Sequence, residues 1–589
     1  MILQALYDYY QRKSATLPQE GFELKEIKYV IVINRSGEFV DLQDLRENKK
    51  GKIFLLPKSE VRSGKNAWQK SSLLWDHYGY ILAHPKDNTE EAVQMALKQN
   101  KTFVENIKSL PLQIKEDEGV NAVLQFYETD QIEKVKAHPN WNDCKKIPGC
   151  NMSFKLDAST ELVPQRGAIT NYIKSTYNET LDEGDKTSEF VAPCLITGES
   201  SIIARLHTPT PIPGGKSNAR LVAFQINSGF DSYSKSKAYN APVSKSAESA
   251  YTTALKHLIS SKSNKVIVAD TTIVYWAEKK TEEVNPEEMF AFLVAQRIDE
   301  DNPDKGVQII ESFIKSVYTG KLSSKETNHF YVLGLSPNAA RISVRFWKAP
   351  SVEDFGLNIK KHFDDFDIVH GPKDHKYLSL YQILSSTALA YKMDNVSPNL
   401  AGAVIESIVD GIPYPRTLMQ QCVRRIRAEQ NINRTRAAIL KAYLNRFYRI
   451  QKTKNKEITM SLDSTNTNVA YRIGRLFAVL EKIQETASPN LNATIRDRYY
   501  GAASTSPITV FPRLLTLKNS HLKNDRISKG SKVYYEKLIG EIISALDSFP
   551  TNLALNEQAH FAIGYYHQRQ DFFVKKSEKE ATEIESNNN

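Results

Sequence analysis

The residues with the most distinctive chemistry in this chain are the cations between positions 416 and 456. This segment holds twelve lysines and arginines and one carboxylate, Glu429, whereas all 589 residues together carry a net charge of +10. A solvated helix face, the alternative interpretation, normally mixes both signs, because opposite charges four residues apart stabilise a helix. An element with almost no acid is typical of a protein that binds a polyanion. We therefore predict contacts with nucleic-acid phosphates from Arg424, Arg425, Arg427, Arg434, Arg436, Lys441, Arg446 and Arg449.

One expected helix, over residues 434–449, carries five of these eight cations. Its apolar residues, among them Leu440 and Leu444, recur at helical spacing and form a face that docks inward. Lys441, Asn445 and Arg449 are spaced by four, so we expect them to share a second face that follows phosphates. Tyrosines near charges are candidates for stacking on unpaired bases, although aromatic residues on a helix face more often belong to the core. These are Tyr443, Tyr448, Tyr499, Tyr500, Tyr565 and Tyr566.

A polar loop at residues 62–72 is a second candidate site. It lies between two apolar stretches, at residues 53–56 and 73–75. Asn and Gln side chains bond to base edges in a DNA groove, Lys binds phosphates, and a glycine lets the backbone approach closely. The alternative is an ordinary polar surface loop. The candidate DNA-binding residues are Arg62, Ser63, Gly64, Lys65, Asn66, Trp68, Gln69, Lys70 and Ser71.

A glycine-rich stretch at residues 213–218 is the third candidate. Glycine-rich loops hold phosphates on backbone N–H groups, but this stretch lacks the spacing of a nucleotide-binding loop. We expect it to contact a nucleic-acid backbone or, alternatively, only to turn a hairpin. The candidate residues are Gly214, Gly215, Lys216, Ser217 and Asn218.

Residues 362–375, HFDDFDIVHGPKDH, raise the possibility of a metal-dependent nuclease. Such enzymes need clustered carboxylates, and this stretch is rich in metal-ligand residue types. Its spacing matches no metal motif, and Phe363, Phe366 and Ile368 suggest the alternation of a strand. Cys144 and Cys150 resemble half of a zinc knuckle, but no second pair follows. We expect reduced thiols, no metal, no cofactor and no catalytic activity.

The elements that position these residues are mixed in the first 350 positions. We expect a hairpin with strands at 30–33 and 39–42, a helix at 90–109, a strand at 221–226, a helix at 244–258 and a strand at 266–277. After residue 350 helices dominate, at 378–392, 399–409, 417–426 and 434–449. Three apolar stripes beginning at Val469, Tyr535 and Ala559 predict a terminal helical bundle.

This pattern predicts a multidomain α+β protein, because so long a chain exceeds one core. An N-terminal mixed α/β body with antiparallel strands is followed by a helical region and a C-terminal helical bundle. The predicted divisions are 1–115, 116–349, 350–459 and 460–575, with a disordered tail at 576–589. No apolar run reaches the ~18 residues that span a bilayer, so we expect a cytoplasmic protein without membrane contact.

Several stretches of the sequence, in order, resemble one known family. The most informative is residues 193–278, which contain PCLITGESSIIARLHTP, PGGKSNARLVAFQINSGFDSY and VIVADTTIVYWAE. MILQALYDYYQR, SSLLWDHYGYIL, FYVLGLSPNAARISVRFW and VAYRIGRLFAVLEKIQ also look like family landmarks. Together they resemble the large subunit of type I-C CRISPR Cascade, the Csd family. The family commonly has an Arg-Thr/Ser-Gly element before the Leu-Trp-Asp landmark, where this chain has Lys70-Ser71-Ser72.

The resemblance implies a non-catalytic subunit of an RNA-guided DNA surveillance complex. Such a subunit recognises the PAM, a short motif in duplex DNA, promotes R-loop formation and holds the displaced strand. Its implied partners are crRNA, target double-stranded DNA, the backbone, handle-binding and small subunits, and a helicase-nuclease recruited after R-loop formation. The alternatives are a stand-alone single-stranded nucleic-acid-binding protein and, with less support, the metal-dependent nuclease.

Met460 precedes the first stripe of the terminal bundle and follows the basic segment. In the resembling family the C-terminal bundle is also made separately, as a small subunit, from an internal translation start. We therefore expect a second product that begins at or near Met460. The alternative is that this residue is an incidental methionine of a linker.

Overall fold

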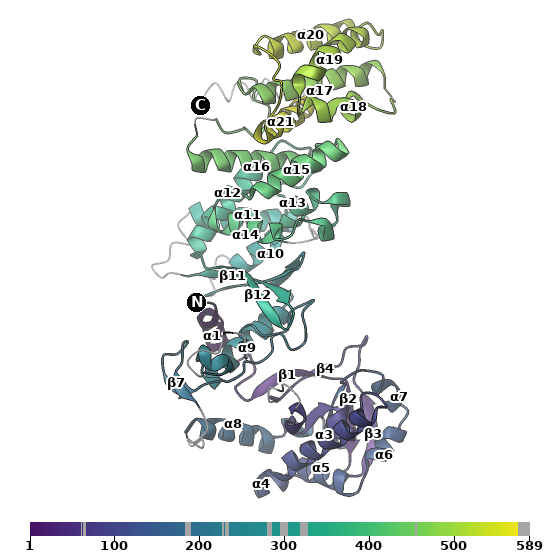
Figure 1. Cartoon of the computed structure of the whole chain (residues 1–589), viewed down its shortest axis with the longest axis vertical. Helices are drawn as coiled ribbons and strands as arrows, with labels where there is room; N and C mark the ends of the chain where they lie inside the picture. Colours follow the sequence, from purple (N-terminus) through teal and green to yellow (C-terminus); the bar gives the residue numbers. More distant parts are fainter. Residues whose placement is uncertain are drawn as a thin grey trace. The chain divides into compact units, whose positions relative to one another are not determined.

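The computed structural model describes residues 1–59, 62, 66–182, 190–225, 229, 235–279, 285–294, 304–318, 328–453, 456–489 and 491–574. The chain is 51% helical and 14% strand, with antiparallel sheets in the N-terminal half and helices in the C-terminal half (Figure 1). This confirms the predicted α+β class. The chain forms two compact units: unit 1 comprises Met1–His257 with Asn338–Ile342, and unit 2 comprises Leu258–Pro337 with Ser343–Asn589.

A four-stranded sheet forms the first core of unit 1, in the order β3-β2-β6-β5. β2 (Tyr29–Ile33) is buried along its whole length and pairs antiparallel with β3 (Phe39–Asp44), which confirms the predicted hairpin. β6 (Asn151–Leu156) runs parallel to β2, and β5 (Trp75–His77) pairs antiparallel with β6. Gly37 turns the hairpin at φ +77°, and a Cβ there would lie 2.5 Å from the backbone nitrogen of Phe126. Glycine is therefore required at this turn.

Helices surround this sheet and complete unit 1. α3 (Glu90–Lys108) and α5 (Glu118–Glu128) bury Phe103, Ile107 and Phe126 in the same core. A separate two-stranded ribbon joins β1 (Phe22–Ile27) to β4 (Lys52–Pro57). The other elements are α1 (Ile2–Arg12), α2 (Tyr78–Leu82), α4 (Leu112–Lys115), α6 (Ile132–Ala137), α7 (Trp141–Cys144), α8 (Gly167–Asp182), β7 (Val191–Pro193) and β8 (Ser200–Ile202).

The block that carries the family landmarks folds partly as predicted. α9 (Lys245–Ser260) buries the predicted apolar face, including Ala247, Tyr251 and Leu255, without measurable exposure. The strand predicted at 221–226 is wrong, because residues 221–225 form no strand and Ile226 lies outside the described residues. The strand predicted at 266–277 is a hairpin of β9 (Lys265–Val268) and β10 (Thr271–Ala277). It turns at Ala269, which has a φ of +53°.

Unit 2 begins with a sheet in the order β12-β11-β10-β9. β11 (Phe330–Asn338) pairs antiparallel with β10, and β12 (Arg341–Lys348) lies at the edge. The helices α10 (Pro286–Val294), α11 (Asp304–Tyr318) and α12 (Val352–Phe366) pack on it through one continuous apolar core. α13 (Leu380–Ser386), α14 (Leu400–Asp410), α15 (Arg416–Glu429) and α16 (Arg434–Gln451) follow. The helix predicted at 378–392 ends at Ser386, because the backbone is extended at Ala388, and Ala390 and Tyr391 have positive φ.

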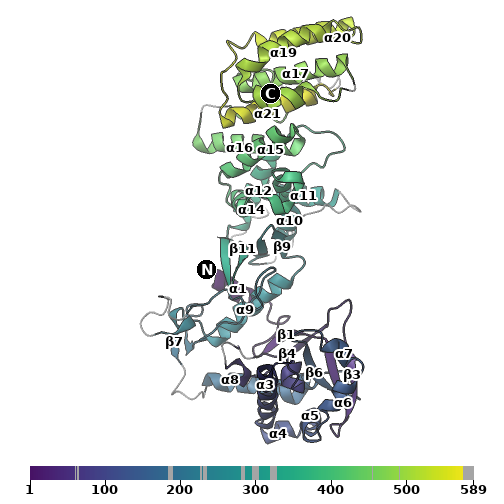
Figure 2. The ribbon, with the colours of Figure 1, turned by 45° about the vertical axis from the view of Figure 1, so that its right-hand side comes forward.

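Five helices complete unit 2; they lie together in Figure 1, and Figure 2 shows α17, α19, α20 and α21 side by side from a second direction. They are α17 (Val469–Ala487), α18 (Ile495–Ala503), α19 (Pro507–Leu522), α20 (Lys529–Ile543) and α21 (Leu555–Asp571). The predicted stripes are buried at Ile473, Leu480 and Ala559, whereas Val469 at the start of the first stripe is 39% exposed. No helix in the described part of the chain has the length and apolar character that crossing a membrane requires.

Candidate nucleic-acid interface

The base of the polar loop at residues 62–72 is held by a buried carboxylate. Asp76, only 2% exposed, accepts a 3.0 Å hydrogen bond from Arg62 Nη1 and a second bond from Nη2 of the same guanidinium. It also accepts the backbone N–H of Ser72 at 2.9 Å and that of His77 at 2.8 Å. The Arg62 guanidinium lies 4.3 Å from the ring centroid of Tyr80. Arg62, predicted to bind DNA, is thus committed to closing the loop.

The strand that leads into the loop is tied to α9. Lys58 Nζ lies 3.4 Å from Glu248 Oε2 and 3.3 Å from Ser249 Oγ. Glu248 Oε1 accepts the backbone N–H of Thr208 at 2.6 Å. Burial alone would raise the pKa of the Glu248 carboxyl, but the Lys58 ammonium and these hydrogen bonds bring it below its ordinary value. The Glu248 carboxylate is therefore charged, and through Lys58 it fixes the chain just before the loop to α9.

The tip of the loop presents polar side chains to solvent. Asn66, Gln69 and Lys70 are exposed, whereas Trp68 is half-buried with Lys98 Nζ 5.7 Å from its ring centroid. The tip backbone is fixed where the Tyr80 hydroxyl donates to the Ala67 carbonyl at 3.1 Å. Ser71 Oγ accepts from Asn106 of α3 at 3.1 Å. The predicted residues Ser63, Gly64 and Lys65 lie outside the described residues.

The second loop, at residues 213–218, is an exposed turn of unit 1. Gly215 N–H donates to the Ile212 carbonyl at 2.9 Å, and Gly214 sits between them with a φ of +76°. This is the geometry of a four-residue turn with Pro and Gly at its centre. Gly214, Lys216, Ser217 and Asn218 are exposed and Gly215 is half-buried. Their predicted contact with a nucleic-acid backbone stays a prediction.

Three of the predicted phosphate-binding cations lie inside unit 2. Arg436 donates to the carbonyls of Ser386 and Asn431 and pairs with Glu429. Lys441 Nζ lies 3.1 Å and 3.4 Å from the carbonyl oxygens of Asp365 and Asp364 in the last turn of α12. A cation favourably satisfies carbonyls at a helix C-terminus.

Arg446 is the third buried cation, and its partner is equally buried. Its Nε donates to Asp365 Oδ2 at 2.7 Å, and the guanidinium lies 4.1 Å from the ring centroid of Tyr414. Asn445, on the face predicted to follow phosphates, exchanges two 2.8 Å hydrogen bonds with the backbone of Ile458. The predicted phosphate contacts of Arg436, Lys441 and Arg446, and the predicted Lys441–Asn445–Arg449 face, are incompatible with this packing. Asp365 and the Ser386 carbonyl come from distant parts of the chain, whereas Glu429 and the Asn431 carbonyl lie within seven residues of Arg436.

The other five cations are at or near the surface of unit 2. Arg434 is half-buried and donates to the carbonyls of His375 and Lys376. Arg425 lies 3.5 Å from Glu429, and Arg449 is exposed but paired with Asp365 and Glu457. Arg424 and Arg427 are exposed on α15. Among the eight predicted cations, these last two are best placed to meet a phosphate.

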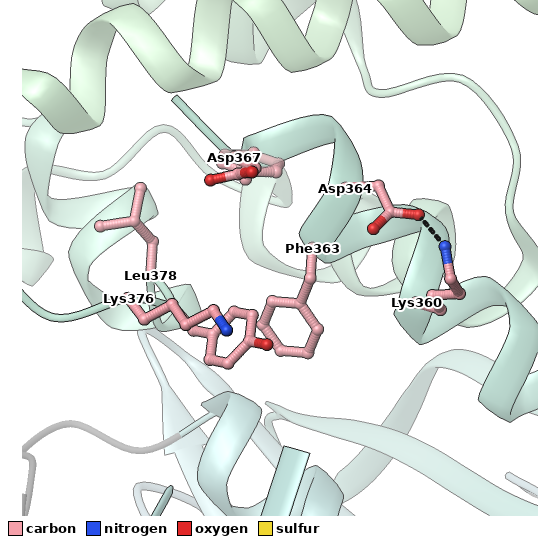
Figure 3. A pocket seen from close by; sticks show the side chains of 8 residues that line it. Lys360, Phe363, Asp364, Asp367, Lys376 and Leu378 are labelled. Carbon is pink, nitrogen blue, oxygen red and sulfur yellow. Dashed lines mark hydrogen bonds and ion pairs between the residues drawn. The ribbon is translucent and has the colours of Figure 1, made fainter. Parts of the chain in front are cut away.

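The segment rich in metal-ligand residues lines a small pocket rather than a metal centre (Figure 3). His362–Phe366 belongs to α12, so the strand-like interpretation is wrong. The His362 imidazole is buried and bonded to the Tyr414 hydroxyl at 2.8 Å. The pocket, of about 270 Å³, is lined by Phe363, Asp364 and six other residues, and Asp364 pairs with Lys360. Within the described ranges, no group of three or more His, Cys, Asp or Glu side chains is arranged to hold a metal ion.

Aromatic residues proposed to stack on bases are mostly core residues. Tyr443, Tyr448, Tyr500, Tyr565 and Tyr566 are buried, and only Tyr499 of this set is half-buried. Stacking on bases by the five buried tyrosines would require unit 2 to unpack.

The family comparison now adds to this geometry. The family model described as CRISPR-associated protein (Cas_Csd1) matches residues 6–573. The chain belongs to the Cas_Csd1 family. No match was found among curated proteins.

In this Cas_Csd1 protein, the residues that sequence reasoning missed are the ones that position the loop. Asp76 follows Trp75 in the landmark stretch, and its single carboxylate among apolar residues was the only local signal. Glu248 interrupts the small and apolar residues of α9, again as a lone acid. The Arg62–Asp76 contact spans the loop and the Lys58–Glu248 contact joins residues far apart in the sequence, so only the fold shows them.

Proposed function

We propose that this Cas_Csd1 protein is the non-catalytic large subunit of a type I-C CRISPR surveillance complex, and that it recognises the PAM through the tip of the loop at residues 62–72. The observation that carries the proposal is the contrast within that loop. Its base is closed by the ion pair of half-buried Arg62 with buried Asp76, whereas Asn66 and Gln69 are exposed on its tip. A rigid base with exposed amides suits base-edge recognition in a groove.

The partners follow from the family. The subunit acts in the cytoplasm with crRNA and the backbone, handle-binding and small subunits, promotes R-loop formation on target double-stranded DNA, holds the displaced strand and recruits the helicase-nuclease. Of the eight predicted phosphate contacts, Arg424 and Arg427, exposed on α15, are our remaining candidates for phosphates of the displaced strand.

The terminal bundle relates to the proposed internal product. All five bundle helices follow Met460, which is 49% exposed. However, α21 also packs on α16, where the Tyr448 hydroxyl lies 2.9 Å from His560 Nε2. We propose that a product beginning at Met460 keeps the bundle but exposes this face of α21.

The proposal is tested by assembling the complex with and without this chain. With the chain, we expect R-loop formation on a target duplex with the correct PAM and much less on a duplex with a scrambled PAM. Without the chain, we expect no R-loop on either duplex. Equal R-loop formation on both duplexes would refute PAM recognition. Cleavage of DNA by the purified chain with Mg²⁺ or Mn²⁺ would instead favour the nuclease.

A further inference from the structure

A pocket beside the loop in unit 1 has the properties of a site for one nucleobase. It has a volume of about 230 Å³ and lies between α2, α3 and the turn at Gly149. Six of its lining residues are His77, Tyr78, His84, Ala92, Ala96 and Gln99. Pockets for drug-sized ligands are typically ~300–1,000 Å³, so this one suits a single ring system.

The pocket walls are aromatic and apolar, with polar groups in fixed orientations. The Tyr78 ring packs edge-on against His84, with centroids 5.3 Å apart. Burial lowers the pKa of both His77 and His84, so both imidazoles are neutral at physiological pH. His77 Nδ1 accepts the Gly79 N–H at 3.1 Å, so the proton of the neutral ring is on Nε2. His77 therefore offers a donor.

Gln99, whose side chain also hydrogen-bonds to Tyr80, brings an amide close to His77. A Cβ at Gly79 would lie 2.6 Å from Gln99 Oε1 and 2.7 Å from His77 Cε1, so only glycine permits this approach. Lys86 also lines the pocket, with its ammonium 3.8 Å from Asp87 Oδ2, and none of the described lining residues is acidic. Stacking surfaces, an edge of donors and acceptors and a nearby cation are what an unstacked nucleotide requires.

The pocket and the loop share one helix. Ala92, Met95, Ala96 and Gln99 of α3 lie on the face that lines the pocket, at the i, i+3, i+4, i+7 spacing. The same helix supports the loop through Lys98 over Trp68 and Asn106 on Ser71. A DNA strand held by the loop would therefore pass close to the pocket.

We propose that this pocket takes one unstacked nucleobase of the target DNA next to the PAM, an inference that rests on the proposed function. Flipping a base out of the duplex costs the free energy of its stacking and pairing. A pocket that binds the base stabilises the opened duplex at the position where the R-loop begins.

The test uses two exposed residues of α3 as a matched pair. Met95 lines the pocket and Val93 does not, and each is 39% exposed. Complexes carrying Met95→Trp or Val93→Trp, and the parent, are titrated with PAM-containing duplexes that have a single abasic site at successive positions beside the PAM. We expect one abasic position to weaken binding to the parent and to the Val93→Trp complex by about 5-fold to 150-fold. It should have little effect on the Met95→Trp complex, because the indole already covers the pocket.

An abasic effect of equal size in both variants, or no such position, would overturn the proposal. The proposal would also be overturned if the abasic effect differed between the two variants only when the abasic site was in the crRNA, because the bound base would then come from the guide. Ala92→Leu, which fills the pocket from its buried side, repeats the measurement if Met95→Trp does not assemble. A scrambled PAM in the same titrations separates the two ideas. If the parent prefers the correct PAM but the abasic effect is the same in both variants, only the nucleobase pocket is refuted. If the parent shows no preference for the correct PAM, the proposed function is refuted.

Discussion

The crossing of α17 and α21 allows a prediction whose size follows from the structure. A Cβ at Gly474 would lie 2.1 Å from the carbonyl oxygen of Phe561, and a Cβ at Gly564 would lie 2.1 Å from that of Tyr471. Real Cβ atoms essentially never approach within 3.0 Å, so Gly474→Ala forces the two backbones apart by roughly 0.9 Å. Overpacking costs about 1–3 kcal/mol and sometimes more, against a gain of about 1 kcal/mol in helix propensity. Because the atoms in the way are backbone and not a flexible side chain, we expect a cost at the upper end of that range and a net loss of about 2 kcal/mol.

The control has the opposite sign. Gly540 lies in α20 with nothing within 4 Å of its added Cβ, so Gly540→Ala should stabilise by about 0.5–1 kcal/mol. Thermal unfolding followed by calorimetry compares the variants. The double variant Gly474→Ala/Gly564→Ala should cost less than the sum of the two, because the helices separate only once. If Gly474→Ala were as stable as the parent, the close crossing would be wrong.

Three further predictions concern charge and chain starts. Arg424→Ala with Arg427→Ala should weaken binding of the complex to single-stranded DNA and reduce the slope of log affinity against log salt concentration by roughly one unit per contact. Arg436→Met, the buried control, should change only the stability of the protein. An unchanged slope would exclude Arg424 and Arg427 from DNA contact. Burial lowers the pKa of the His567 imidazole to about 3 in the folded protein. As the pH falls, this imidazole is therefore protonated in the unfolded chain before it is protonated in the folded one. We expect the free energy of unfolding to drop by about 2 kcal/mol between pH 7 and 5, and His567→Gln to lack that part of the pH dependence, which chemical unfolding at both pH values measures. Intact mass spectrometry of complexes from the unmodified gene should find a fragment beginning at or near Met460, and its persistence after replacement of that codon would contradict the start.

The amphipathic helices were predictable because apolar spacing depends on which face is buried. The stripe from Ile473 to Ile483 and the face of α9 illustrate this. The basic segment was not predictable in the same way, because a cation's sequence neighbours do not show its partner. Arg446 pairs with Asp365, 81 residues earlier. A buried cation satisfied by distant acids and carbonyls looks, in sequence, like one that faces solvent.

The candidate site, too, was predictable from the sequence only in part. Residue types at 62–72 indicated an exposed polar loop, and its tip at Asn66 and Gln69 is exposed. The roles of Arg62 and Lys58 depend on Asp76 and Glu248, which only the fold brings to them. Sequence patterns thus located the loop but not the residues that hold it.

The central claim is that the loop tip reads the PAM, and Asn66→Ala with Gln69→Ala tests it most directly. Each amide that contacts a base edge contributes about 1–3 kcal/mol of discrimination. Binding of the assembled complex is measured on duplexes with the correct and a scrambled PAM, with Gln94→Ala, an exposed glutamine of α3, as control. We predict that the double variant loses affinity for the correct PAM and little for the scrambled one, while the control is unchanged. Equal weakening on both duplexes would contradict base recognition and leave the loop only a role in positioning DNA.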